Sequence, residues 1–211
     1  MSSQTDNTED LLKKAGEGDE QAINELFARH RDRLRWMVRL RLNRRLQGRV
    51  DPSDVLQEAY LEVCKGFANY IRSPNLPFFL WLRHITGQKL IAVHRQHLGA
   101  QMRDAEQEVS LYRGALPETN SVSLAAQLLG RLTSASQAAV RAETQIRVQE
   151  ALNSMEPIDR EILALRHFEM LSNEEVAQVL NIKKSAASNR YIRALRRLKN
   201  ILSTIPGFLD D

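Results

Sequence analysis

Hydrophobic residues recur every three or four positions along most of this chain, which is the spacing of one face of an α-helix. The first long stripe predicts a helix over about residues 20–43, and it consists of Ile23, Leu26, Phe27, Leu34, Met37 and Val38. Glycine and proline are sparse, and no run of alternating β-branched residues is long enough to predict a sheet. We therefore expect an all-α fold.

Two further helices are predicted before residue 99. The first is expected to begin at Asp51, because aspartate caps a helix, Pro52 suits its first turn and Asp54 favours the positive end of the helix dipole. Its inward stripe is Leu56, Ala59, Tyr60, Val63 and Phe67. The segment RSPNLP then interrupts the chain, and another helix is expected from Phe78 to about His97, with an inward stripe of Phe78, Trp81, Leu82 and Ile85.

The composition of the sequence changes from about residue 99 to residue 134. This segment is polar and its hydrophobic residues are weakly periodic, which predicts a linker. A second helical unit, long enough for four helices, follows from about residue 138 to residue 202. The sequence thus predicts two small helical domains joined by a flexible linker. The expected divisions are a partly disordered tail at 1–19, a first domain at 20–98, the linker at 99–137, a second domain at 138–205 and a tail at 206–211.

The last two helices of the second domain carry the clearest local signals. Ser172 and Glu175 have the spacing of a capping box, with Val176, Ala177 and Leu180 expected inside. Asn181 suits a left-handed turn residue. The next helix has an inward stripe of Ala187, Tyr191, Ala194 and Leu198. Its outward residues are Ser185, Ser188, Asn189, Ile192, Arg193 and Arg196.

This pattern is a helix-turn-helix, and its outward residues suit a recognition helix. Asparagine and arginine can pair with purine edges in the major groove, whereas serine and lysine suit phosphate or mixed contacts. A plain structural hairpin of two helices has the same inward stripes and remains the alternative on this pattern alone.

Charge adds a second reason to consider a polyanion. The formal net charge is only +4, but the basic residues gather in two blocks. The first block consists of Arg29, Arg31, Arg33, Arg35, Arg39, Arg41, Arg44, Arg45 and Arg49. The second consists of Lys183, Lys184, Arg190, Arg193, Arg196, Arg197 and Lys199. Two separate basic blocks favour a polyanion bound at two places, and the alternative is a pair of solvated helix faces.

The single cysteine, Cys64, lies among apolar residues and is expected to be a buried thiol in a reducing compartment. No apolar run approaches the length of a membrane span, and the polar start MSSQTDNTED lacks the order of a secretion signal. We expect a cytoplasmic protein with no membrane partner.

The stretch LNSMEPIDREILALRHFEMLSNEEVAQVLNIKKSAASNRYIRALRRLKNIL resembles region four of the sigma-70 family of bacterial RNA polymerase initiation factors. In the first domain, DPSDVLQEAYLEVCKGFANY resembles the polymerase-binding helix of region two, and FFLWLRHITGQKLIAVHRQ resembles the adjoining strand-opening helix. Two such segments in the right order, without a long N-terminal extension, resemble the compact extracytoplasmic-function (ECF) subgroup.

The resemblance implies a transcription initiation factor that binds core polymerase through its largest-subunit clamp helices and its flap, and that recognises and melts promoter DNA. An anti-sigma protein that holds the factor inactive is a further partner that the sequence leaves open. The clamp-binding face expected from three-and-four spacing is Asp54, Gln57, Glu58, Leu61 and Glu62. Asp54 and Gln57 match the family's motif directly. An ordinary solvated face is the alternative.

For the strand-opening helix, the resemblance implies contacts to the opened minus-ten strand. The candidates are Trp81, Arg83, His84, Lys89 and Arg95. A core role for Trp81 is at least as well supported as base stacking, because its spacing is that of a core stripe. Ala92 and Val93 are apolar where the family often has polar or aromatic residues.

For the recognition helix, the resemblance implies minus-thirty-five contacts from Lys184, Ser185, Ser188, Asn189, Ile192, Arg193 and Arg196. The chain departs from the family here, because Ser185, Ala186, Ala187 and Ser188 stand where Gly-Thr-Val and a basic residue are common. Met170 stands where a glycine is frequent before the capping box. The promoter sequence therefore does not follow from relatives. An acidic cluster in the linker, Asp104, Glu106 and Glu108, suggests occupation of a basic channel of the polymerase.

Other function classes fit less well. The sequence has no phosphate-binding glycine loop, no HExxH and no convincing nucleophile with a base, so we expect no catalytic residue, no cofactor and no metal. His94 and His97 have a spacing that can hold a metal, but no cysteine or acidic partner is near in sequence. An autonomous dimeric regulator that binds duplex DNA and a purely protein-binding helical adaptor remain as alternatives.

Overall fold

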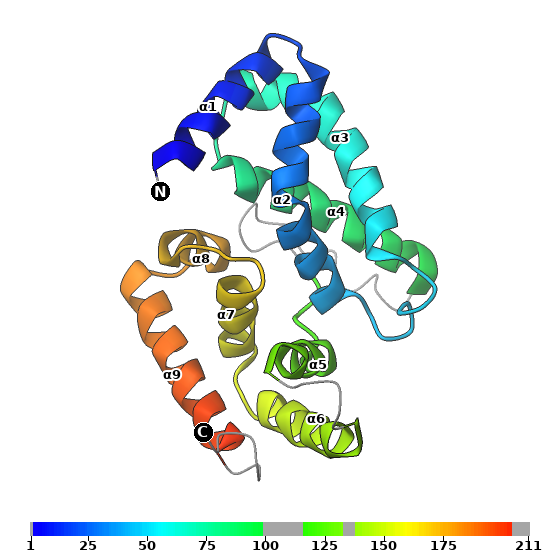
Figure 1. The fold of residues 1–211 in the computed structure, drawn as a ribbon, viewed down its shortest axis with the longest axis vertical. Helices are drawn as coiled ribbons and strands as arrows, with labels where there is room; N and C mark the ends of the chain where they lie inside the picture. The colour runs from blue at the N-terminus through cyan, green and yellow to red at the C-terminus, as the bar shows by residue number, and fades with distance from the viewer. Residues whose placement is uncertain (1, 99–115, 133–137, 204–211) are drawn as a thin grey trace. The chain divides into compact units, whose positions relative to one another are not determined.

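The computed structural model describes residues 2–98, 116–132 and 138–203 of the 211-residue chain. Every regular element in those ranges is an α-helix (Figure 1), which confirms the all-α prediction for the described residues. The chain divides into two compact units. One unit comprises Met1–Val38 and Arg44–Gln107, and the other comprises Arg39–Asn43 and Glu108–Asp211. None of the described helices is long and apolar enough to cross a membrane.

The helices of the first unit follow the predicted stripes. They are α1 (Ser2–Gly16), α2 (Glu20–Arg41), whose last residues belong to the second unit, α3 (Pro52–Arg72) and α4 (Phe78–Leu98). Helix α1 lies where the sequence suggested a tail, and its Leu11 and Ala15 are buried. All six residues of the stripe predicted for α2 are buried, namely Ile23, Leu26, Phe27, Leu34, Met37 and Val38.

Helix α3 begins as the sequence predicts. The Asp51 carboxylate accepts a hydrogen bond of 2.7 Å from the backbone N–H of Ser53, and Pro52 occupies the first turn. Within its predicted stripe only Tyr60 is half-buried; Leu56, Ala59, Val63 and Phe67 are buried. The expectation of a buried Cys64 is wrong, because this thiol is exposed. Cys64 follows buried Val63, and one residue along a helix is a rotation of about 100° away from the core.

An aromatic cluster joins α3 to α4. The indole of Trp81 is stacked on the ring of Tyr70 with a centroid distance of 4.5 Å, and it meets Phe67 edge-on at 6.2 Å. The hydroxyl of Tyr70 donates a hydrogen bond of 3.0 Å to the carbonyl of Leu76, in the connection between the two helices. The cluster therefore fixes the angle at which α4 leaves the connection, and Trp81 is part of it.

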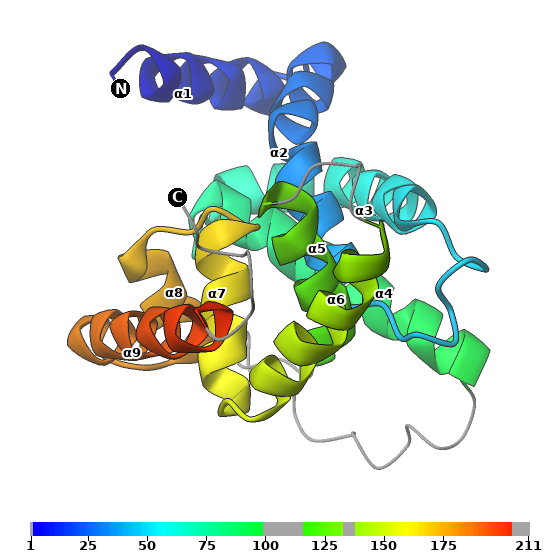
Figure 2. The ribbon, with the colours of Figure 1, turned by 60° about the horizontal axis from the view of Figure 1, so that its bottom comes forward.

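The second unit contains α5 (Ser121–Leu132), α6 (Ala138–Asn153), α7 (Pro157–His167), α8 (Asn173–Leu180) and α9 (Lys184–Leu202). The four helices predicted for this region are α6 to α9. Helix α5 was not predicted, because it lies in the segment assigned to the linker. Figures 1 and 2 both show α5 beside α6, and α9 against α7 and α8. The buried residues Leu124 and Leu129 of α5 are part of this unit's core.

One arginine of the first basic block is in the core of the second unit. The side chain of Arg41 is fully buried and forms ion pairs with Glu161 and, at 2.6 Å, with Glu169. Burial alone lowers the pKa of Arg41, but the two carboxylates outweigh burial and raise the pKa above its usual value. Thr119 donates a hydrogen bond of 2.5 Å to Glu161. Arg41 is thus a structural cation, and for this one member of the first basic block neither a polyanion contact nor a solvated face is correct.

The helix-turn-helix has the predicted local geometry. Ser172 and Glu175 form a complete capping box at the start of α8. Asn181 ends α8 in the left-handed conformation, with φ 51° and ψ 49°. Val176 and Ala177 are buried and Leu180 is half-buried. Just before the capping box, Met170 also has a positive φ, 56°, although it is not glycine and its side chain is 64% exposed.

The conformation of Met170 leads to a stability prediction. We expect Met170→Gly to raise the free energy of unfolding by about 1 kcal/mol, because a left-handed backbone costs a residue with a Cβ more than it costs glycine. Urea denaturation of the two proteins measures the difference. Met170→Ala is the control, since it removes the exposed side chain and keeps the backbone strain. An equal gain for both variants would show that the side chain, and not the backbone, is responsible.

Candidate functional site

The outward face of α9 is the first candidate surface. Ala187, Ala194 and Leu198 are buried and Tyr191 is half-buried, so these residues hold the helix against its neighbours as the inward stripe predicts. The residues predicted for the outward face are accessible: Ser188 is half-buried, and Lys184, Ser185, Asn189, Ile192, Arg193 and Arg196 are exposed. The face combines hydroxyl, amide and guanidinium groups with one aliphatic side chain.

Polar contacts behind this face fix the rotation of α9. The guanidinium of Arg190 donates to Glu156 at 2.8 Å and to Asp159 at 3.0 Å, which ties α9 to the start of α7. Its hydrogen bonds to these carboxylates raise the pKa of Arg190 and lower the pKa of Glu156. The Tyr191 hydroxyl is 3.2 Å from Nε2 of His167. Arg190 is thus a positioning residue, although the sequence placed it in a basic block for a polyanion.

The remaining basic residues of α9 differ in their contacts. Lys184 forms an exposed ion pair with Glu174 at 3.2 Å, and Arg197 donates to the hydroxyl of Ser154 at 3.2 Å. Arg193 and Arg196 form no ion pair among the described residues. These two guanidiniums are therefore the cations most readily available to an anionic partner on this face.

The second candidate surface is the outward face of α3. Its predicted members lie on one side of the helix: Asp54, Gln57, Glu58 and Leu61 are exposed, and Glu62 is partly exposed. The side chain of Leu61 is 59% exposed in the middle of this polar set. An apolar residue ringed by carboxylates and an amide suits a helical partner that carries basic residues around an apolar contact.

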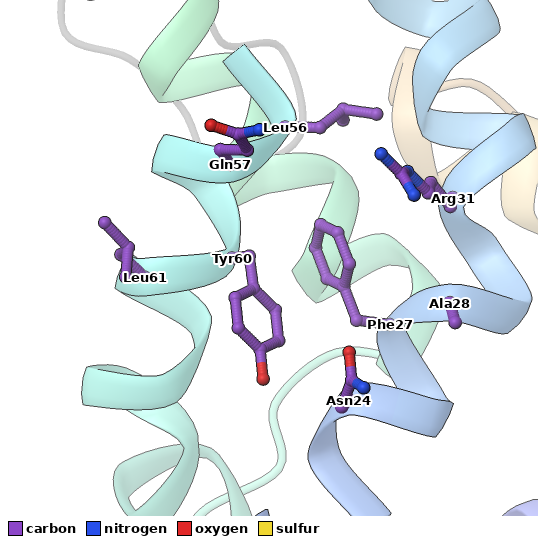
Figure 3. Close-up of a pocket in the computed structure, with 8 residues that line it drawn as sticks. All are labelled: Asn24, Phe27, Ala28, Arg31, Leu56, Gln57, Tyr60 and Leu61. Carbon is purple, nitrogen blue, oxygen red and sulfur yellow. The ribbon is translucent and has the colours of Figure 1, made fainter. Parts of the chain in front are cut away.

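A pocket of about 390 Å³ lies beside this face, between α2 and α3. Figure 3 shows Phe27 and Tyr60 reaching into the space from the two helices, with Gln57 and Leu61 on the α3 side. The rings of Phe27 and Tyr60 meet edge-on, with a centroid distance of 5.2 Å. The rest of the lining is Leu56 of α3 and Asn24, Ala28 and Arg31 of α2. Sequence reasoning missed the α2 side, because only the packing of α2 against α3 places those residues next to the predicted face.

The third candidate set is on α4, and the structure separates its members. Arg95 is exposed, whereas Arg83 is 6% exposed and therefore poorly placed to contact a phosphate. His84 is half-buried, and burial, together with the charge of Arg83, lowers its pKa, which disfavours the cationic form that a phosphate would bind. The indole of Trp81 is half-buried and covered on one face by Tyr70, which favours its core role.

Lys89 of α4 is joined to the face of α3. Its ammonium is 3.1 Å from Oε1 of Glu62, and Lys65 approaches the same oxygen at 3.2 Å. The hydrogen bonds from Lys89 and Lys65 lower the pKa of Glu62. The structure therefore brings together one residue predicted for a protein partner and one predicted for DNA.

The sequence also singled out a pair of histidines as a possible metal site and an acidic cluster in the linker. His94 is buried, with a pKa lowered by burial, whereas His97 is exposed, so the two rings do not share an open site. Within the described residues, no group of three or more histidine, cysteine, aspartate or glutamate side chains could hold a metal. The acidic cluster of Asp104, Glu106 and Glu108 lies outside the described residues.

Known proteins resemble this chain over the same elements. Residues 145–198, which contain α7, α8 and most of α9, match the family described as Sigma-70, region 4. The RNA polymerase sigma factor CarQ of Myxococcus xanthus is 24% identical over 196 residues, or 92% of this chain and 97% of CarQ. The ECF RNA polymerase sigma factor SigD of Mycobacterium tuberculosis is 28% identical over 200 residues, or 95% of this chain and 86% of SigD.

A solved structure with a similar fold is that of CnrH in complex with the cytosolic domain of CnrY. The TM-score is 0.52 and the sequence identity is 22%, with 92% of this chain and 96% of the other chain covered. At this identity the likeness concerns the fold.

The contacts of α9 predict different consequences for two neighbouring arginines. We expect Arg190→Ala to lower the free energy of unfolding by about 1 kcal/mol, because it removes two charge-assisted hydrogen bonds to α7. Arg193→Ala is the matched control and should change stability by less than about 0.5 kcal/mol, because it is an exposed surface substitution. Urea denaturation followed by circular dichroism measures both. Equal losses in the two variants would contradict the positioning role of Arg190.

Proposed function

We propose that this chain is an ECF member of the sigma-70 family, an RNA polymerase sigma factor that binds core polymerase and directs it to promoters, as its likeness to such factors supports. In this role it recognises promoter DNA, assists strand opening and starts transcription in the cytoplasm. The role requires no chemical step by this chain and no cofactor. An autonomous duplex-binding regulator is not favoured, because the likeness to sigma factors extends over nearly the whole chain.

The observation that carries this proposal is the outward face of α9. Its exposed residues sit on a helix-turn-helix with a complete capping box, inside the segment that matches sigma-70 region 4. We assign to this face the recognition of the minus-thirty-five element in the major groove. Asn189 and Arg193 are suited to hydrogen bonds with base edges, and Arg196 and Lys184 to phosphate contacts.

The outward face of α3 is the proposed contact with the clamp helices of the largest polymerase subunit. Asp54, Gln57 and Glu58 offer carboxylate and amide groups, and Leu61 offers an apolar contact next to the pocket between α2 and α3. An apolar side chain of the partner helix that enters this pocket would bury Leu61 and Tyr60. The flap of the polymerase is the proposed partner of the second unit.

The exposed side of α4 is proposed to hold the opened minus-ten strand. Arg95 is accessible to a phosphate. Lys89 can also bind a phosphate if that phosphate replaces Glu62 as its ion-pair partner. That exchange costs little, because solvent screens a partly exposed ion pair. Arg83, His84 and Trp81 support the helix from its packed side.

Each DNA-reading surface is small, so each is expected to bind DNA weakly and mainly through salt-sensitive phosphate contacts. Attachment of both units to one rigid polymerase raises the effective concentration of the second contact after the first has formed. Promoter selectivity then depends on core enzyme. CnrH was solved with the cytosolic domain of CnrY, and we propose that an anti-sigma protein is a partner of this chain too.

The test is selection of DNA from a randomised promoter-like pool, with and without bacterial core polymerase, at two salt concentrations. We expect selective binding only when core enzyme is present, because core holds the two reading surfaces at a fixed distance. Fluorescence anisotropy with the selected duplex measures the affinity. Selective binding by the protein alone would favour the autonomous regulator and would leave the α3 face without a role.

Two substitutions should separate the two proposed surfaces. We expect Gln57→Ala, and likewise Asp54→Ala, to weaken binding to core polymerase about tenfold. Arg193→Ala should leave core binding unchanged and weaken binding of the assembled holoenzyme to the selected promoter by about tenfold. Core binding is measured by titration with protein that carries a fluorophore on its N-terminal amine, which leaves the α3 face unlabelled.

Matched controls are available in each unit. Lys13→Ala replaces an exposed lysine of α1, and Arg147→Ala replaces an exposed arginine of α6; neither helix carries a proposed face. Both controls should bind core polymerase and promoter like the unmodified protein. Equal losses in both assays for Gln57→Ala and Arg193→Ala would indicate misfolding and would contradict the division of roles.

A further inference from the structure

Ile192 is a large apolar residue in the middle of the polar outward face of α9. Its side chain is 47% exposed, whereas Ala187, Ala194 and Leu198 of the same helix are buried. On the same face, Ser188 lies one turn before it and Arg196 one turn after it. A single exposed apolar side chain is ordinary on a protein surface, so its position and not its exposure alone carries the argument.

The structure holds Ile192 in a fixed orientation. Arg190 and Tyr191, the two residues before it, are bonded to α7 through Glu156, Asp159 and His167. Isoleucine is branched at Cβ and strongly prefers one χ1 rotamer in a helix. Ile192 therefore presents a rigid aliphatic surface at a defined place, which is what discrimination between similar partners requires.

The neighbours of Ile192 decide which partner suits it. Arg193 is adjacent and Arg196 lies one turn on, and neither forms an ion pair among the described residues. An apolar protein surface that covered Ile192 would also bury these two guanidiniums away from water, at a large cost. Duplex DNA instead offers phosphates to the arginines. The apolar group that it presents in the major groove is the 5-methyl group of thymine.

We propose that Ile192 is a specificity-determining residue that contacts the 5-methyl group of a thymine in the minus-thirty-five element. This inference rests on the proposed function and adds the chemistry of one base position to it. Asn189 and Arg193 read neighbouring bases by hydrogen bonds, and Ile192 reads a base by shape. A cytosine at that position lacks the methyl group and would lose water from its amino group without gaining a partner.

The experiment removes the methyl group and leaves base pairing unchanged. Holoenzyme formed with core polymerase is titrated with the selected promoter duplex and with duplexes in which one minus-thirty-five thymine at a time is deoxyuridine. We expect one of these replacements to weaken binding by about three- to fivefold, the effect of burying roughly one methyl group. Ile192→Ala should weaken binding to the thymine duplex by a similar factor and should be insensitive to deoxyuridine at that position.

Two further variants serve as controls. Ile192→Val should keep most of the methyl sensitivity, because it retains a branched aliphatic side chain. Ile146→Ala changes an isoleucine that is 57% exposed on α6, away from the recognition face, and should behave like the unmodified protein.

The outcomes separate this inference from the proposed function. A selected promoter with no methyl-sensitive thymine would overturn the inference alone, as would an Ile192→Ala holoenzyme that keeps the full sensitivity. Absence of any core-dependent selection would overturn the proposed function, and the inference with it.

Discussion

The rotation of α9 about its own axis decides which of its side chains can meet a partner. Burial of Ala187, Ala194 and Leu198 sets that rotation, and the two hydrogen bonds from Arg190 to α7 hold it. A rotation by one residue, about 100°, would in one direction replace Asn189 and Arg193 on the outer surface by Arg190 and Ala194, which now face α7 and the core. The proposed reading of DNA therefore depends on packing as much as on the residues that face outward.

Helix α3 of the first unit, like α9, has one side that packs in the core and one side that is exposed. One side packs Leu56, Ala59 and Val63 into the core, and the other exposes the proposed polymerase contacts. Glu62 at the edge of that face pairs with Lys89 of α4. The proposed protein contact and the proposed strand contact are thus adjacent in one unit.

The basic residues show why net charge alone says little about binding. Arg41 is buried between two carboxylates, Arg33 lies over the ring of Phe79 at 3.4 Å, and Arg190 is bonded to α7. Arg193 and Arg196 are exposed at the surface. These arginines are indistinguishable in composition. Their environments differ because carboxylates and rings from other helices reach some of them and not others.

The sequence by itself determined the helices, their caps and their inward stripes, because these depend on residues within a few positions of one another. The capping box at Ser172, the cap at Asp51 and the turn at Asn181 were all predicted from such local patterns. It also indicated which residues of α3 and α9 face outward. Tertiary structure alone decided the burial of Arg41, the exposure of Cys64, helix α5 and the pocket between α2 and α3. These features depend on contacts between segments distant in the chain, or on which side of a helix a neighbour covers, and no local pattern records either.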